Sequence, residues 1–103
     1  MALRSRPDKI LYDRAKGLMR FTAFEGSERV ECAISVWALA ALEDEALEGA
    51  AAMAATYRRN RGIILEAANR KHREGQFESD GTVIVRVPDV ALQAWQLRVP
   101  ARR

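Results

Sequence analysis

The chain has 103 residues, of which 49% are hydrophobic and 30% are charged, and its formal net charge is +3 at pH 7. This length and composition indicate one globular domain and exclude wholesale disorder. No apolar run is long enough to span a membrane, and the first residues lack the apolar region of a signal peptide, so we expect a cytoplasmic protein without membrane contact. The net charge is too small to indicate a polyanionic partner by itself.

The first residues give little sign of regular structure. Residues 1–9 combine several cations with Pro7 and few apolar side chains, so we expect a loose N-terminal segment. Residues 12–17 then favour a turn, because Asp13 can accept hydrogen bonds from backbone N–H groups and Gly17 can adopt a positive φ. We place the core of a single domain, which comprises residues 1–103, between residues 12 and 87.

Two stretches of alternating character, residues 18–24 and 29–35, predict a β-hairpin with one buried face. A two-residue turn of type II′ at Gly26 and Ser27 would pair Glu25 with Glu28 and fix the register. A three-residue loop would turn the apolar residues of the second strand away from those of the first, so we reject it. Six apolar side chains then share the buried face: Met19, Phe21, Ala23, Val30, Cys32 and Ile34. Since the chain has a single cysteine, an internal disulfide is excluded.

Two helices are expected after the hairpin. Ser35 can cap a short helix that begins at Val36. A run of four carboxylates suits the first turn of a second helix, where the backbone dipole favours anions: Glu43, Asp44, Glu45 and Glu48. From Ala46 the apolar residues recur at helical spacing to about Arg73.

A continuous second helix of about 28 residues would be roughly 42 Å long, which exceeds the ~30 Å that a 20-residue helix already spans across a small domain. This helix must therefore overhang, bend or break. The polar stretch of residues 58–62, which includes Gly62, is the expected place, because glycine costs about 1 kcal/mol relative to alanine inside a helix.

The C-terminal third predicts a second hairpin. Gly75 ends the helix, and Asp80–Gly81 before a β-branched run indicates a type I′ turn that would pair Phe77 with Ile84. Residues 89–97 fit either a helix capped by Asp89 or a strand, and we favour a short helix. Residues 98–103 are expected to form a frayed tail. The expected fold is therefore α+β, in which two hairpins form an antiparallel sheet and a short helix and a long, bent helix pack on one face.

The sequence contains no pattern typical of catalysis or of metal binding. His72 is the only histidine, and we expect a solvated helix residue. No Cys-x-x-Cys or His-x-x-x-His spacing occurs, and no glycine-rich phosphate loop or nucleophile elbow is present. We therefore expect a non-catalytic protein without a metal or a cofactor.

Arg61 lies on or beside the apolar stripe of the long helix. An arginine in this position usually extends its charge outward to solvent. The alternative is a structural ion pair, for which Asp13 is the first candidate partner and Glu31 the second.

Six cations crowd the segment of residues 58–73 against Glu66 alone, and they form the candidate surface for a partner or for nucleic acid: Arg58, Arg59, Arg61, Arg70, Lys71 and Arg73. Helical spacing divides these cations between different sides, and the segment lacks interleaved aromatic residues for base stacking. We therefore expect, at most, weak and sequence-independent nucleic-acid binding that fades with salt.

The long helix also separates charge, since carboxylates lie near its start and cations near its end. Two such helices packed antiparallel would bring opposite charges together twice, as a symmetric dimer requires. We therefore expect a homodimer, or a module that binds another protein partner.

Several stretches together resemble a family of small bacterial proteins catalogued as domain of unknown function 1488: Tyr12–Asp13, Met19–Phe21, Val30–Ser35, Arg58–Arg61, Ile64–Lys71 and Asp80–Val83. The resemblance covers about residues 12–87. It implies a compact α+β domain of bacterial, cytoplasmic origin, and it brings no assigned activity, cofactor or binding residues. Combined with the absence of a catalytic pattern, it favours a small interaction or regulatory module.

Overall fold

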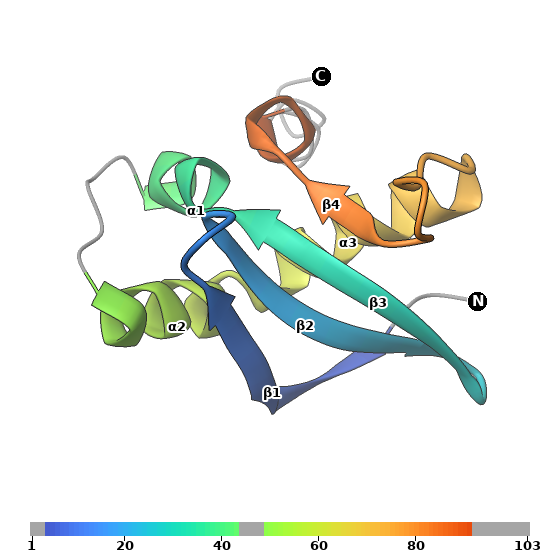
Figure 1. Cartoon of the computed structure of the whole chain (residues 1–103), viewed down its shortest axis with the longest axis horizontal. Coiled ribbons are helices and arrows are strands. Elements are labelled where there is room, and N and C mark those ends of the chain that lie inside the picture. The colour runs from blue at the N-terminus through green and yellow to red at the C-terminus, as the bar shows by residue number, and fades with distance from the viewer. Residues whose placement is uncertain (1–3, 44–48, 92–103) are drawn as a thin grey trace, which may run out of the picture.

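A computed structural model gives the fold and describes residues 4–43 and 49–91 (Figure 1). Its strands form one sheet in the order β1-β2-β3-β4, in which the first two pairings are antiparallel and β3 and β4 run parallel. The strands are β1 (Arg4–Asp13), β2 (Leu18–Glu25), β3 (Glu28–Ser35) and β4 (Val83–Val85). The expected α+β class is confirmed, but the sheet is mixed and not antiparallel throughout.

The helices lie in the crossover that joins β3 to β4: α1 (Val36–Glu43), α2 (Gly49–Arg59) and α3 (Arg61–Arg73). A further helix begins at Val87 and continues through Ala91, where the described part of the chain ends. Figure 1 shows α2 and α3 behind the sheet, so that they cover one of its faces. Among the described residues, the opposite face carries no helix.

The register predicted for the first hairpin is confirmed. Glu25 pairs with Glu28, Phe21 with Cys32, and Gly26 adopts a φ of +64° in the turn between them. All six apolar residues assigned to the inner face are buried. This prediction succeeded because the period-two alternation and the turn chemistry independently require the same pairing.

The prediction of a second hairpin is wrong. Residues 76–78 form no strand, and β4 instead pairs in parallel with β3, with Val83 opposite Cys32. A turn does lie at this point, but one residue earlier than predicted: the Gly81 N–H donates to Glu78 O at 2.9 Å and the Glu78 N–H donates to Thr82 O at 2.8 Å, so Glu78 and not Ser79 lies opposite Thr82. Within this turn, the Thr82 N–H donates to Asp80 Oδ1 at 3.0 Å and Gly81 has a φ of +90°. The turn leads out of a loop rather than out of a strand, because too few residues separate it from the end of α3.

The loose N-terminal segment expected for residues 1–9 is wrong for residues 4–9, which belong to β1. Backbone pairing with β2 orders this segment without an apolar pattern, as Arg4 lies opposite Phe24. The pairing shifts register between Ser5 and Ile10, a stretch that contains Pro7. Residues 1–3 and the expected tail at 98–103 lie outside the described residues. Of the short helix favoured for residues 89–97, the structure describes only the first residues, and these are helical.

The long helix breaks where its polar stretch predicts. Asn60 separates α2 from α3 and has non-helical dihedral angles of φ −112° and ψ 19°. Its side-chain amide donates to Thr56 O and to Glu43 Oε2, both at 2.9 Å. The cap predicted at Ser35 is also confirmed, since its hydroxyl accepts from the Ala38 N–H at 3.1 Å.

The prediction that four carboxylates form the first turn of the second helix is wrong for Glu43, the one of the four that the structure describes. Glu43 is the last residue of α1, and α2 begins at Gly49 without an acidic first turn. The other three carboxylates of this run lie in residues 44–48, outside the described part. Glu43 serves instead as an anchor, because Arg59 Nη2 and Nε donate to its two oxygens at 2.6 and 2.9 Å.

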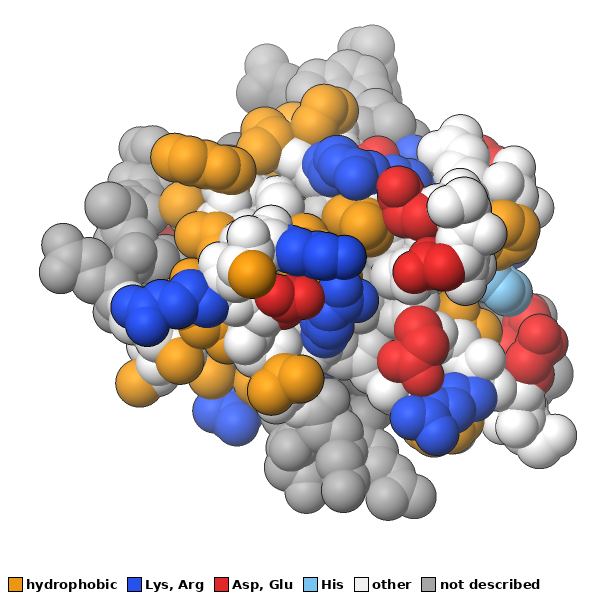
Figure 2. Space-filling model, viewed as in Figure 1, with side chains coloured by type: hydrophobic (Ala, Val, Ile, Leu, Met, Phe, Trp, Pro, Cys, Tyr) orange, Lys and Arg blue, Asp and Glu red, His pale blue; other side chains and the backbone are white. Residues whose placement is uncertain are grey.

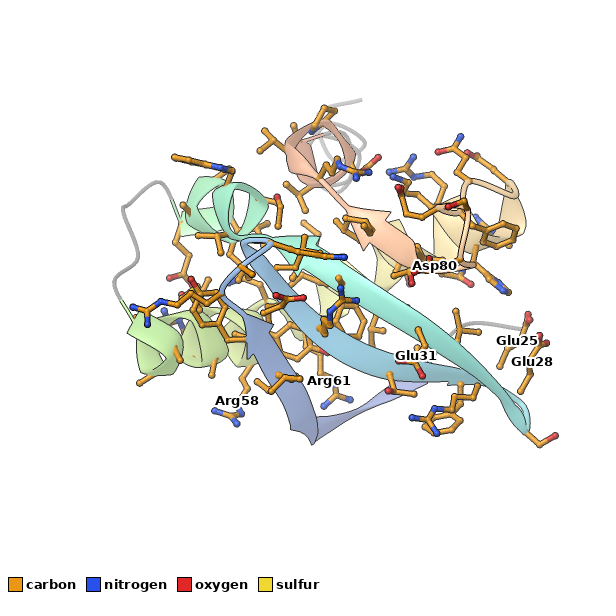
Figure 3. The ribbon with its side chains drawn as sticks, in the orientation of Figure 1. Glu25, Glu28, Glu31, Arg58, Arg61 and Asp80 are labelled. Carbon is orange, nitrogen blue, oxygen red and sulfur yellow. The ribbon has the colours of Figure 1, made fainter. Side chains whose placement is uncertain are left out.

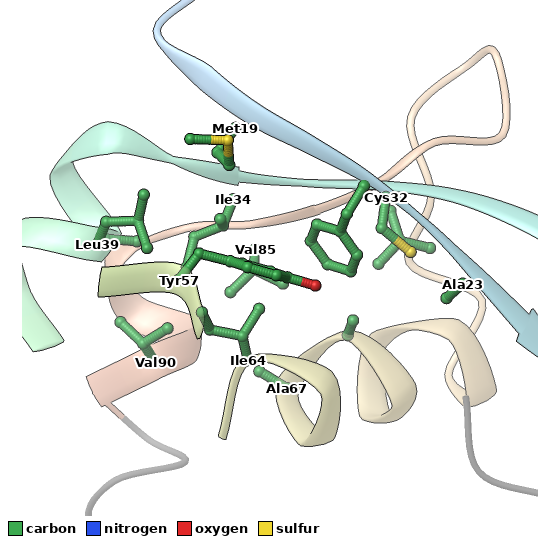
Figure 4. Packing of buried hydrophobic residues seen from close by; sticks show 14 of the residues in the cluster. Met19, Ala23, Cys32, Ile34, Leu39, Tyr57, Ile64, Ala67, Val85 and Val90 are labelled. Carbon is green, nitrogen blue, oxygen red and sulfur yellow. The ribbon is translucent and has the colours of Figure 1, made fainter. Parts of the chain in front are cut away.

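The core lies between the inner face of the sheet and the two covering helices (Figure 4). Tyr57 of α2 is fully buried, and its ring packs against that of Phe21 with 5.1 Å between centroids. Ile64 of α3 and Val85 of β4 complete this layer. Burial of these side chains supplies the main stabilisation of the fold.

The anchor at Glu43 predicts a specific acid sensitivity. Hydrogen bonds from Arg59 and then Asn60 lower the pKa of Glu43 from 4.5 to about 2. Because the folded pKa is depressed, the stabilisation is complete above the unfolded pKa and is lost as the pH falls from about 4.5 towards 2. Glu43→Gln should therefore flatten the loss of unfolding free energy across this window, as measured by urea denaturation at each pH.

Glu66→Gln is the matched control for this experiment, because it removes an exposed carboxylate of α3. The control should follow the wild-type acid curve. If the unfolding free energy fell equally steeply with decreasing pH in the wild type and in Glu43→Gln, the result would contradict the role of Glu43 as an anchor.

Candidate partner-binding groove

One edge of β3 is only partly covered by its neighbour β4. The three residues of β4 pair with Cys32, Ala33 and Ile34 of β3. Within the described chain, the earlier residues of β3, Glu28–Glu31, have no strand partner on that side. An uncovered strand edge presents free N–H and C=O groups and is a ready template for another chain.

The end of α3 and the loop after it build a wall opposite this edge. Gly75 takes a φ of +72°, and the Gln76 N–H donates to Lys71 O at 2.9 Å while the Gly75 N–H donates to His72 O at 3.2 Å. This bonding pattern is a Schellman motif, which turns the chain sharply away from the helix axis. The Asp80–Gly81 turn then reverses the chain into β4, and Phe77 is left 48% exposed between the two turns.

His72 lies on the floor of this region and is not the solvated residue expected. Its side chain is only 17% exposed, and its ring meets that of Phe77 edge-on with 5.7 Å between centroids. His72 Nδ1 lies 3.9 Å from a carboxylate oxygen of Glu25 at the end of β2. The aromatic contact holds the loop against the helix.

The edge and the wall enclose a groove of about 340 Å³, which we call the β3-edge groove. This volume lies at the lower end of the range for ligand pockets. Carboxylates border the groove from both sides, as Figure 2 shows beside the pale blue histidine and Figure 3 shows for the labelled Glu28, Glu31 and Asp80. The lining residues are Glu28, Arg29, Val30, Glu31, His72, Phe77, Asp80 and Gly81.

The charged side chains of the groove differ in whether they already have a hydrogen-bond or ion-pair partner. Glu31 accepts from Arg29 Nε at 2.8 Å and from the Thr22 hydroxyl at 3.3 Å. The Thr82 N–H lowers the pKa of the Asp80 carboxyl, which therefore stays ionised. Glu28 is exposed, and its side chain forms no hydrogen bond or ion pair with any other described residue. The groove thus has a net negative charge within a chain whose net charge is positive.

A second, smaller hollow of about 200 Å³ lies on the open face of the sheet, on the other side of the Asp80 turn. Its central cation, Arg20, is engaged by Asp13, with 3.0 Å between Nε and Oδ2. This contact lowers the pKa of Asp13. Because Arg20 is already paired with Asp13, its charge is not free to bind a ligand in the hollow. We therefore assign the candidate site to the β3-edge groove.

The structure disperses the six cations predicted as one surface. Lys71 is only 8% exposed, and its ammonium donates to Ile84 O at 2.8 Å and to Asp89 Oδ2 at 3.0 Å. Arg70 donates to Asp89 O, and Arg59 is held by Glu43. Arg58 and Arg73 are exposed, and Figure 3 places Arg58 and Arg61 on the β1 side of the molecule, away from the groove.

The ion pair proposed between Arg61 and Asp13 is wrong. Asp13 instead pairs with Arg20, which lies diagonally across from it on the neighbouring strand β2. Glu31, the second candidate, pairs with Arg29. Both carboxylates thus find an arginine within the sheet: Asp13 across the β1–β2 pairing, and Glu31 two residues along its own strand, where side chains share a face.

The remaining reactive groups support no site of their own. Burial raises the pKa of the Cys32 thiol to about 12, which leaves it neutral and unreactive. Within residues 4–43 and 49–91, no three metal-ligating side chains gather. No helix in the same ranges is long and apolar enough to cross a membrane.

The architecture defines a class of small α+β module, in which a mixed four-stranded sheet is covered on one face by a broken helix. The family model described as a protein of unknown function, DUF1488, matches residues 7–85, so the chain belongs to the DUF1488 family. The crystal structure of a DUF1488 protein of unknown function from Shewanella loihica PV-4 has the same fold, with a TM-score of 0.74 and 19% identity over 82% of this chain and 91% of that chain. The search of curated proteins found no match.

Sequence reasoning predicted a turn at Asp80 and Gly81, but it assigned no wall residue of the groove to a site. It placed Phe77 inside a strand and treated His72 as solvated. One available signal was the short spacing between Gly75 and Asp80, which leaves only four residues between two turn-forming positions. Four residues confined between two such turns favour a compact loop over a paired strand.

The buried position of Lys71 predicts a large stability effect. Lys71→Met removes the cation and leaves the Asp89 carboxylate, which is only 16% exposed, without it. Breaking one side of a buried ion pair costs about 3–5 kcal/mol of unfolding free energy. Chemical denaturation should show this loss, whereas Arg73→Met, at an exposed cation two residues away, should change stability by less than about 0.5 kcal/mol. If the two substitutions lowered the unfolding free energy equally, the result would contradict the buried ion pair of Lys71.

Proposed function

We propose that the protein is a non-catalytic module that binds another protein through the β3-edge groove. The observation that carries this proposal is the juxtaposition of an unpaired strand edge, Glu28–Glu31, with a half-exposed aromatic ring, Phe77. Unpaired backbone groups offer hydrogen bonds to a partner backbone, and a rigid aromatic side chain supplies contact area at low entropic cost.

Three ion pairs elsewhere in the described chain serve structural contacts, which favours binding over catalysis. The Glu43–Arg59, Asp13–Arg20 and Lys71–Asp89 pairs each join two elements of the fold. The groove contains a histidine but no serine or cysteine within its lining that could act as a nucleophile.

Nucleic acid is a weaker candidate for this groove than protein. Three carboxylates in the lining would repel phosphate groups. The weak binding expected from the basic segment would have to use Arg58, Arg61 and Arg73 without Lys71, whose ammonium is engaged inside the fold.

Self-association remains part of the proposal, but its expected basis changes. The helix that was to carry opposite charges at its two ends is broken at Asn60, and Glu43 is engaged by Arg59. A second copy of the chain would therefore bind through the groove rather than along an antiparallel helix pair.

Site-specific photo-crosslinking tests the proposal. The photoreactive residue p-benzoylphenylalanine, placed at position 77 of the full chain, should capture one defined partner in cells of the source organism. The same residue placed at position 11 is the control, because Leu11 is 67% exposed on β1, away from the groove. The captured protein, once purified, should bind the wild-type chain and not Phe77→Ala.

Three outcomes decide the proposal. An adduct of dimer mass from position 77 alone would support it and identify the partner as a second copy. Adducts that are identical at positions 77 and 11 would overturn the groove as the binding site. A purified partner that binds Phe77→Ala as tightly as the wild type would also overturn it, provided that the variant keeps the wild-type melting temperature.

A further inference from the structure

We propose that the partner segment is an extended, lysine- or arginine-bearing peptide that adds to β3 as a strand alongside Glu28–Glu31. This inference rests on the proposed function and specifies the chemistry of the partner. Three observations carry it: the direction of the backbone groups along the open edge, the position of β4, and the charge of the walls.

The register of the hairpin determines which backbone groups point into the groove. Glu28 pairs with Glu25 across a two-residue turn, and Val30 pairs with Ala23. In such a hairpin the pair next to the turn exchanges hydrogen bonds, and alternate pairs do so thereafter. The N–H and C=O of Arg29 therefore point away from β2 towards the groove, where β4 does not reach them and no described turn or loop backbone group bonds to them.

The position of β4 shows where an added strand would lie. Neighbouring strands are about 4.8 Å apart, and β4 occupies this position beside β3 only from Val83 onward. Before Val83, the chain turns aside at Asp80 and Gly81, and the groove fills the space next to β3. A bound peptide would extend the line of β4 along Glu28–Glu31.

The side chains around this position select the peptide. Glu31 of β3 and Asp80 in the turn before β4 both line the groove, so peptide side chains along it meet carboxylates. Val30 and Phe77 line the same groove and offer apolar surface. Glu28 lies on the same side of β3 as Val30, because side chains two residues apart along a strand share a face, and its carboxylate has no hydrogen-bond or ion-pair partner among the described residues. A peptide that carries both cationic and apolar residues matches this lining.

The other edge of the sheet is poorly suited to the same role. β1 shifts register between Ser5 and Ile10, and Pro7 in this stretch lacks an N–H. Irregular pairing, proline and charged residues are the usual features that protect an edge strand from pairing with another chain. Strand addition is therefore expected at β3 and not at β1.

A fluorescein-labelled peptide in which lysine and valine alternate tests the inference on the full-length chain. Fluorescence anisotropy should show saturable binding that weakens as salt rises from about 50 to about 200 mM. The matched peptide with glutamate in place of lysine should not bind. Glu28→Gln should weaken binding about threefold, because it removes one exposed charge and keeps the side-chain shape.

Backbone methylation separates strand addition from simple charge attraction. Methylating the peptide amides of one alternate set should weaken binding about tenfold, since these N–H groups donate to β3. Methylating the other set should leave binding nearly unchanged. If both methylated peptides bind like the parent, strand addition is overturned. If the glutamate peptide binds as well as the lysine peptide, the cationic partner is overturned.

This test fails separately from the proposed function. If no labelled peptide binds while position 77 captures a specific partner, the peptide chemistry is overturned and the groove remains the binding site. If position 77 also captures nothing specific, both the groove and its peptide are overturned.

Discussion

The buried ammonium of Lys71 is the constraint on which the second half of the fold depends. A cation that is 92% buried needs close partners, and Lys71 finds them in the carbonyl of Ile84 and the carboxylate of Asp89. The same carboxylate accepts from the Arg86 N–H at 2.8 Å and so stabilises the first turn of the last helix. One side chain of α3 thus holds β4 and the helix after it in position. This contact places Val83–Val85 beside β3 and, as a consequence, leaves the earlier part of that strand uncovered.

The groove follows from this geometry and not from a dedicated motif. α3 ends in a Schellman motif, and the chain must then reach the line of β4 within a few residues. The two tight turns shorten β4, and Phe77 between them packs against His72. The sheet therefore begins late on this side, where Glu28, Arg29 and Glu31 of β3 face the loop across an acidic hollow. A fold of this size can form such a groove without losing any residue from its core.

The sequence predicted the features that depend on local chemistry. The hairpin register, the Ser35 cap, the turn at Asp13–Gly17 and the break near Asn60 each follow from neighbouring residues. It failed where distant segments compete for the same partner. The local Asp-Gly signal could not reveal that β4 pairs with β3 across a long crossover, and charge counting could not reveal that Lys71 is buried while Asp13 binds Arg20. The site was missed because its walls join residues from β3, α3 and the following loop.

Amide hydrogen exchange at Arg29 tests the central claim most directly, because this N–H reports whether the β3 edge is open. Exchange of individual amides can be followed by NMR in the full-length protein. We expect fast exchange at Arg29 and slow exchange at Val30 in the free chain, with Arg29 becoming slow when the lysine–valine peptide is bound. Equal protection of Arg29 and Val30 in the free chain would contradict this claim, because the edge would then already be paired.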